Sequence, residues 1–135
     1  MDHKILGLCA AKIHEDDCYR RIDAIEKAAE KRGYKLLVFD PEVILAMEKD
    51  FEARNLLFMM NTDKLAGLII DAEHIADKRV VLALRDKAKE KNIPFVSFNM
   101  SLEGTVSVIS NPENTFRELL NHLSSVHGCK TFDYV

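Results

Sequence analysis

Residues Ala66–Asp71 have the sequence AGLIID, a run of apolar and small residues that ends at a single acid. Three more runs of this kind occur along the chain: Ile5–Ala11, Leu36–Phe39 ending at Asp40, and Ile93–Phe98 ending at Asn99. Amphipathic helical patterns fill the intervals between the runs. Near-continuous apolar strands that alternate with helices are typical of a parallel sheet covered on both faces. The sequence therefore predicts a doubly wound, mostly parallel α/β domain.

The expected sheet has five or six strands, because each strand-to-strand step crosses a helix. For a domain of this size we expect the flavodoxin-like strand order 2-1-3-4-5, with helices on both faces. The fifth strand is expected over Thr105–Ile109 and a last one over Thr131–Val135. A looser helical pattern runs from residue 42 to residue 60.

Capping residues indicate where the helices begin and end. The expected N-caps are Asp16 or Asp17, then Asp77, and Asn111 followed by Pro112. Gly33 is expected to end the first helix in the left-handed conformation. The helix that starts at Pro112 has an apolar face made of Phe116, Leu119, Leu120 and Leu123. We expect this face to fold back on its own sheet or to pair with a second chain, which favours a homodimer.

Composition restricts the partners of the chain. Its 135 residues are 47% hydrophobic and 30% charged, values of a single globular domain. The net charge of −3, without a basic cluster, argues against nucleic acid. No apolar run has the ~18–20 residues of a membrane helix. The three cysteines are scattered and lack CxxC spacing, which predicts reduced thiols and a cytoplasmic location. Cys9 is expected in the core, whereas a lowered pKa for Cys18 is a less favoured possibility.

The motifs of common catalytic sites are absent from the sequence. The turn after the first apolar run has neither a GxGxxG nor a Walker A pattern, and no nucleophile elbow occurs. The five histidines show no metal-binding spacing, and His122 and His127, five residues apart, are expected on different helix faces. The sequence predicts no catalytic residues, no cofactor and no metal. One alternative stays open, a receiver-like phosphoacceptor that uses Asp71.

In open α/β sheets, ligands bind beyond the carboxyl ends of the strands. Polar residues follow most of the expected strands in this chain, and Asp71 and Glu73 are two acids directly after the central strand. The candidate ligand-binding residues are Lys12, His14, Asp17, Asp40, Asp71, Glu73, Asn99 and Asn111.

Several segments, in their order and spacing, carry a family resemblance. They are Lys4–Leu8, Ile25–Tyr34, Leu65–Ile70, Asn92–Val96, Ser110–Asn111 and His122–Lys130. Together they resemble the first lobe of the periplasmic-binding-protein-like sensor domains, whose fold is shared with the lactose repressor family. The resemblance implies that residues 1–111 form this first lobe. It also implies that residues 112–135 are the first helix and strand of a second lobe, most of which is missing.

The branch that the sequence resembles is found N-terminal in bacterial signalling proteins with a diguanylate cyclase or histidine kinase output domain. The resemblance implies a non-enzymatic sensor of a small molecule, sugar-like or of another kind, with a fused or adjacent output domain. There is no room for a helix-turn-helix before the first strand, so DNA binding is not expected. An interaction module that dimerises and binds no ligand is the remaining alternative.

Overall fold

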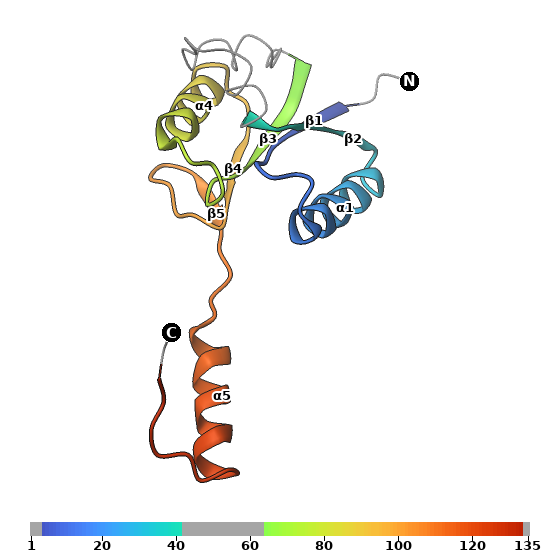
Figure 1. Ribbon diagram of the computed structural model, residues 1–135. Coiled ribbons are helices and arrows are strands. Elements are labelled where there is room, and N and C mark those ends of the chain that lie inside the picture. The colour runs from blue at the N-terminus through green and yellow to red at the C-terminus, as the bar shows by residue number, and fades with distance from the viewer. Residues whose placement is uncertain (1–3, 42–63, 134–135) are drawn as a thin grey trace.

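The computed structural model describes residues 4–41 and 64–133, and its strands form one sheet (Figure 1). The strands are β1 (Lys4–Cys9), β2 (Tyr34–Phe39), β3 (Leu65–Asp71), β4 (Phe95–Phe98) and β5 (Val106–Val108). The helices are α1 (Asp16–Glu30), α4 (Lys78–Glu90) and α5 (Glu113–Ser125). All pairings are parallel and the order is β2-β1-β3-β4-β5. The predicted α/β class and strand order are confirmed.

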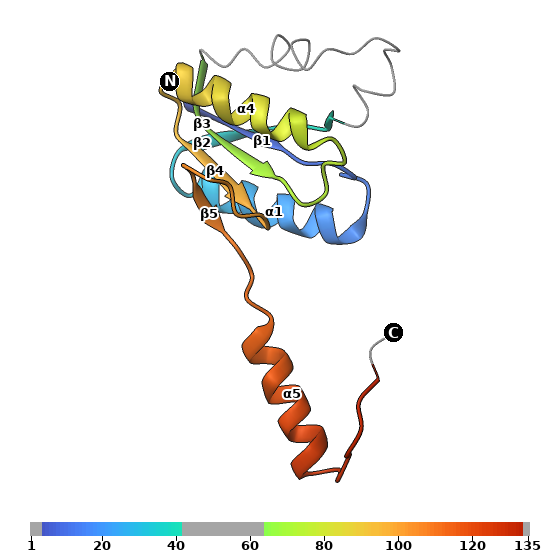
Figure 2. The same ribbon diagram turned by 90° about the vertical axis from the view of Figure 1, so that its left-hand side faces the viewer.

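Helices α1 and α4 lie on opposite faces of the sheet (Figure 2). Cys18 of α1 packs with Leu8 of β1 and with Ala10, which follows β1. Ile22 and Ile25 of α1 pack against the same cluster. On the other face, α4 buries Val80, Val81, Leu84 and Ala88 against the central strands. Because β3 is covered on both sides, all of its residues are apolar or small until Asp71. This is the physical origin of the run that predicted the fold.

The helix termini agree with the predicted signals at two of four places. Gly33 adopts a positive φ of 78° after α1, a conformation that costs little without a Cβ. The Asp77 carboxylate accepts a hydrogen bond of 2.9 Å from the Arg79 backbone N–H. At α5 the N-cap is Pro112, so the expectation of Asn111 is wrong by one residue, although Asn111 Oδ1 accepts a hydrogen bond of 3.0 Å from the Glu113 N–H. At α1 the N-cap is Glu15, so the expectation of Asp16 or Asp17 is wrong. Both aspartates lie in the first turn, where the helix dipole favours negative charge.

Two strand predictions need correction, and one helix prediction lies outside the described residues. The fifth strand covers only Val106–Val108 of the expected Thr105–Ile109. Residues 131–133 have no regular secondary structure, so the last strand is absent from the described part of that segment. No neighbouring strand is paired with it there, and an unpaired strand is unstable in water. The helical pattern of residues 42–60 falls within the part that the structure does not describe.

Helix α5 stands away from the sheet, on a segment of irregular backbone that spans residues 109–112 (Figures 1 and 2). Its apolar face is open to solvent, with Phe116 55% and Leu119 51% exposed. The expectation that this face folds back on its own sheet is therefore wrong. Part of β5 is open to solvent as well, since Val106 and Val108 are exposed. Neither surface has a cover among the described residues.

Candidate functional site

A buried ion-pair cluster lies where β3 ends, at the carboxyl edge of the sheet. Asp71 is the last residue of β3, and only 4% of its side chain is exposed. Arg21 of α1 donates from Nη2 to Asp71 Oδ2 at 3.2 Å. His74, in the loop that follows β3, places Nδ1 3.2 Å from Asp71 Oδ1. We call these three residues the Asp71 cluster. Both oxygens of the carboxylate are thus engaged by groups from two different elements.

The sheet-facing side of α1 positions Arg21 above the end of β3. Arg21 lies three residues after the buried Cys18, and side chains three apart share one helix face. Its side chain is 30% exposed, but Nε is buried and has no hydrogen-bond partner among the described residues. A buried donor without a partner costs about 1–3 kcal/mol. The guanidinium therefore has one buried N–H without a partner among the described residues, while 30% of the Arg21 side chain reaches solvent at the edge of the sheet.

Two thiols lie close to this cluster, on the strand and helix that flank it. Cys9 ends β1 and is fully buried, as predicted. Burial, together with the charges of Asp40 and Asp71, raises the Cys9 pKa from 9.0 to about 12. Burial also raises the Cys18 pKa, which outweighs the opposite effect of Arg21. The possibility of a lowered Cys18 pKa is therefore wrong, and neither thiol is activated as a nucleophile.

Thiol labelling is expected to separate the three cysteines. At pH 8 in the native protein, iodoacetamide should modify Cys129, which is partly exposed, while Cys9 and Cys18 react only after unfolding. The thiolate is the reactive form. Burial shields Cys9 and Cys18 from the reagent and also disfavours their ionisation. Intact-mass analysis over time measures the result. The Cys129→Ser variant should show no fast phase, and fast labelling of Cys9 in that variant would contradict this assignment.

The raised Cys9 pKa also links stability to alkaline pH. Because the folded state holds the thiol proton up to about pH 12, it binds more protons than the unfolded state above pH 9. The contribution of Cys9 to stability is complete below pH 9 and decreases as the pH rises from there towards 12. In Cys9→Ala this part of the alkaline dependence should disappear, as urea midpoints measured at pH 7 and pH 10 would show.

The predicted site residues after β1 and β3 are largely solvent-exposed. Lys12 and His14 lie in the loop between β1 and α1, and Lys12 Nζ forms an ion pair of 3.5 Å with Glu15. Asp17 is exposed in the first turn of α1. The Glu73 side chain is exposed too, while its backbone carbonyl accepts a hydrogen bond of 3.1 Å from Lys78 Nζ. The charge of Asp71, unlike that of Glu73, is compensated inside the protein.

The two predicted asparagines have structural roles at the ends of β4 and β5. Asn99 adopts a positive φ of 62°, and its backbone N–H donates to the Val108 carbonyl at 2.9 Å. Asparagine tolerates this left-handed conformation better than most residues. Asn111 accepts a hydrogen bond from the Glu113 backbone N–H at the start of α5 and lies on the irregular segment that leads away from the sheet. Asp40 follows β2, Asp71 ends β3 and Asn99 follows β4, so all three lie at the carboxyl edge of the same parallel sheet, with β1 between β2 and β3.

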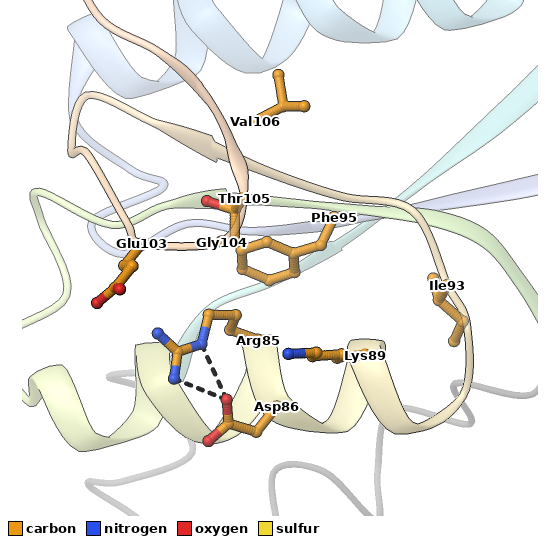
Figure 3. A pocket seen from close by; sticks show the side chains of 9 residues that line it. All are labelled: Arg85, Asp86, Lys89, Ile93, Phe95, Glu103, Gly104, Thr105 and Val106. Atoms are coloured by element: carbon orange, nitrogen blue, oxygen red, sulfur yellow. Dashed lines mark hydrogen bonds and ion pairs between the residues drawn. The ribbon is translucent and has the colours of Figure 1, made fainter.

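A cavity of about 700 Å³ lies at the opposite end of the strands (Figure 3). Arg85 and Lys89 of α4 line it on one side, and Phe95, Glu103 and Val106 on the other. Phe95 and Val106 begin β4 and β5, so this cavity opens at the amino ends of these strands. Arg85 is paired with Asp86 at 2.7 Å. None of the predicted site residues lines the cavity, and its opposed charges offer no net attraction to one class of ion.

The histidine spacing gave a wrong expectation near the C-terminus. His122 and His127 are in contact, with their Nε2 atoms 3.2 Å apart, because α5 ends between them. Across residues 4–41 and 64–133, no group of three or more His, Cys, Asp or Glu side chains is arranged to hold a metal ion. In the same described ranges, no helix is both long enough and apolar enough to cross a membrane.

Sequence comparisons leave the family open. A scan against models of protein families gives no match, and a search of curated proteins gives none either.

Proposed function

We propose that this chain is a non-enzymatic ligand-sensing lobe of a bacterial signal-transduction protein, with its ligand at the carboxyl edge of the sheet. The observation that carries the proposal is the Asp71 cluster, a buried polar group in an otherwise apolar strand layer. Burying a charge is costly unless it is paired, and here the pairing groups come from a helix and a loop that meet at this edge. The edge where they lie is the one that open α/β sheets use for ligands.

The chemistry of the cluster suits a small polar molecule that carries hydroxyl or carboxyl oxygens. The Arg21 side chain is 30% exposed, and His74 is 32% exposed and has a second ring nitrogen besides the one near Asp71. Asp71 orients both groups, much as outer carboxylates orient histidines in other sites. A sugar-like ligand fits this donor set, and Glu73 and Asn99 lie on the same edge.

Sensing in this proposal depends on a second lobe. Residues 1–111 form the first lobe, and residues 112–135 begin the second, which explains why α5 stands clear of the sheet. Ligand held between the lobes would shift the population of closed arrangements and so bias an attached output domain. The chain itself then needs no catalytic group, no cofactor and no membrane.

The geometry disfavours the phosphoacceptor alternative. A receiver aspartate attacks a phosphoryl donor with a carboxylate oxygen that is open to solvent and adjacent to a bound cation. Here both Asp71 oxygens are engaged, and the neighbouring groups are a guanidinium and an imidazole rather than further acids. Incubation with acetyl phosphate and Mg²⁺ is expected to add no phosphoryl group by intact mass.

Chemical-shift mapping tests the proposed ligand site. The ¹⁵N-labelled chain is titrated with a panel of pentoses, hexoses and sugar phosphates, and amide shifts are followed in two-dimensional spectra. Saturable shifts at residues 71–74 and 99 are the expected result. Shifts confined to residues 103–106 and Lys89 would move the ligand to the cavity at the amino ends of β4 and β5. Glu73→Gln should weaken binding at the carboxyl edge, while Lys89→Gln serves as the matched control.

The exposed face of α5 favours a second candidate function, that of a dimerisation module. Phe116, Leu119 and Leu120 are about half exposed, so each would gain roughly half of the ~1.5–3 kcal/mol that full burial of an exposed side chain contributes. Sedimentation velocity at 1–100 μM, a concentration range chosen on the order of typical dimer affinities, is expected to show a homodimer. In Phe116→Ser/Leu120→Ser the equilibrium should move to the monomer. Thr115→Ser, on the same helix, is the control that should leave the mass unchanged.

A further inference from the structure

Two imidazoles near the C-terminus are brought together by the way α5 ends. The Val126 backbone N–H donates to the His122 carbonyl at 2.9 Å, which closes the last helical turn. Gly128 then reverses the chain with a φ of +68°. The Cys129 N–H donates to the Leu123 carbonyl at 3.1 Å and holds the returning segment against the helix. His127 is therefore directed back to His122 by three backbone features, without help from other side chains.

The resulting contact has a geometry that metal chemistry can use. The Nε2 atoms of His122 and His127 are 3.2 Å apart, the ring centroids are 5.0 Å apart, and the rings are inclined by 70°. Two imidazole nitrogens on one tetrahedral Zn²⁺, each at 2.0–2.1 Å, are separated by about 3.3 Å. Both side chains are exposed, so an ion has access without any rearrangement.

We propose that His122 and His127 form a two-histidine site for a divalent transition-metal ion of the Zn²⁺ class. Neutral imidazole suits Zn²⁺, Ni²⁺ and Cu²⁺, whereas Mg²⁺ and Ca²⁺ prefer oxygen ligands. The described residues add no third ligating side chain, so water occupies the other coordination positions. The bound ion links the segment after α5 to the helix. This site lies apart from the carboxyl edge of the sheet and does not depend on the proposed ligand function.

A simple hydrogen bond between the two rings is the competing explanation. It requires one ring to donate from Nε2 and the other to accept, and such a bond between exposed groups contributes only about 0.5–1.5 kcal/mol net in water. Residues 131–133 have no regular structure, and the backbone hydrogen bond from Cys129 to Leu123 holds the returning segment, so an ion would add a second, side-chain link to the helix. The two explanations differ in one measurable property, which is affinity for metal.

Isothermal titration of the tag-free chain with ZnCl₂ at pH 7.5 tests the site. The expected result is saturable binding of one ion per chain, which is lost in His122→Ala and lost equally in His127→Ala. His14→Ala removes an exposed histidine elsewhere and should leave binding unchanged. Far-ultraviolet circular dichroism of each variant checks that the helices remain. Because imidazole must be neutral to bind, affinity should fall steeply between pH 7.5 and pH 5.5.

Three results would overturn the proposal. One is the absence of saturable Zn²⁺ binding to the unmodified chain, which would leave only the hydrogen bond. Another is binding that survives His122→Ala or His127→Ala. The third is loss of binding in Cys129→Ser, which would make the thiol rather than the histidine pair the essential ligand.

Discussion

Replacing Asp71 by alanine is expected to destabilise the protein by about 3 kcal/mol, near the lower limit for breaking a buried ion pair. Asp71 is almost fully buried, and the variant would leave Arg21 and His74 facing an uncharged gap. The value is placed at the lower limit because 30% of the Arg21 side chain reaches solvent and can rehydrate. Urea unfolding followed by circular dichroism measures the change in the free energy of unfolding.

A double variant shows whether Asp71→Ala destabilises the protein through the broken Arg21–Asp71 ion pair or through a cavity in the packing. Arg21→Met/Asp71→Leu removes both charges and fills the space with apolar atoms, so most of the lost stability should return. Arg21→Met alone should cost about as much as Asp71→Ala, since it leaves the buried carboxylate without its cation. Additive losses in the double variant would show that the two residues do not stabilise each other.

The second large effect is expected in α4, where two leucines form a matched pair. Leu84→Ala should cost about 3 kcal/mol, within the range of about 2–5 kcal/mol for buried leucines. Leu84 is 1% exposed and packs in the larger core cluster, whereas Leu82 is 41% exposed on the same helix. Leu82→Ala should therefore cost less than about 1 kcal/mol, because most of the removed surface already contacts water.

The comparison of these two variants also tests the layer arrangement. Helix propensity changes equally in both, so the difference between their denaturation midpoints isolates burial against the sheet. Equal losses in both variants would mean that α4 does not bury the face that contains Leu84. Such a result would contradict the packing of α4 on that face of the sheet.

The fold could be predicted from particular residues because burial on both faces leaves a clear pattern. The β3 run is apolar or small from Leu65 to Ile70 since α1 and α4 cover its two sides. Terminal signals such as Gly33 and Asp77 are local, so the sequence predicts them without knowledge of distant contacts. The N-cap of α1 was missed because three consecutive acids, Glu15–Asp17, compete for one position.

The candidate site was predicted only in part. Asp71 was identified because it ends an apolar strand, and the parallel sheet places it beside the ends of the neighbouring strands. Arg21 and His74 were not identified. The available signal for Arg21 was its spacing of three from Cys18, which puts a cation on the buried side of α1. Helix spacing alone does not say which strand end that side chain reaches.

The amino-acid sequence by itself determined where the five strands of the sheet lie, two of the helix ends, the parallel arrangement and the carboxyl edge that carries Asp71. These depend on hydrophobic periodicity and on capping chemistry, which act over a few residues. Only the tertiary structure decided that Arg21, fifty residues away in the chain, pairs with Asp71, and that α5 leaves its apolar face open. It also decided that His122 and His127 are in contact. The prediction assumed that both residues are helical, whereas α5 ends at Ser125 and the chain turns back before His127 meets His122. Contacts between separate elements depend on how those elements pack, and no local pattern records that.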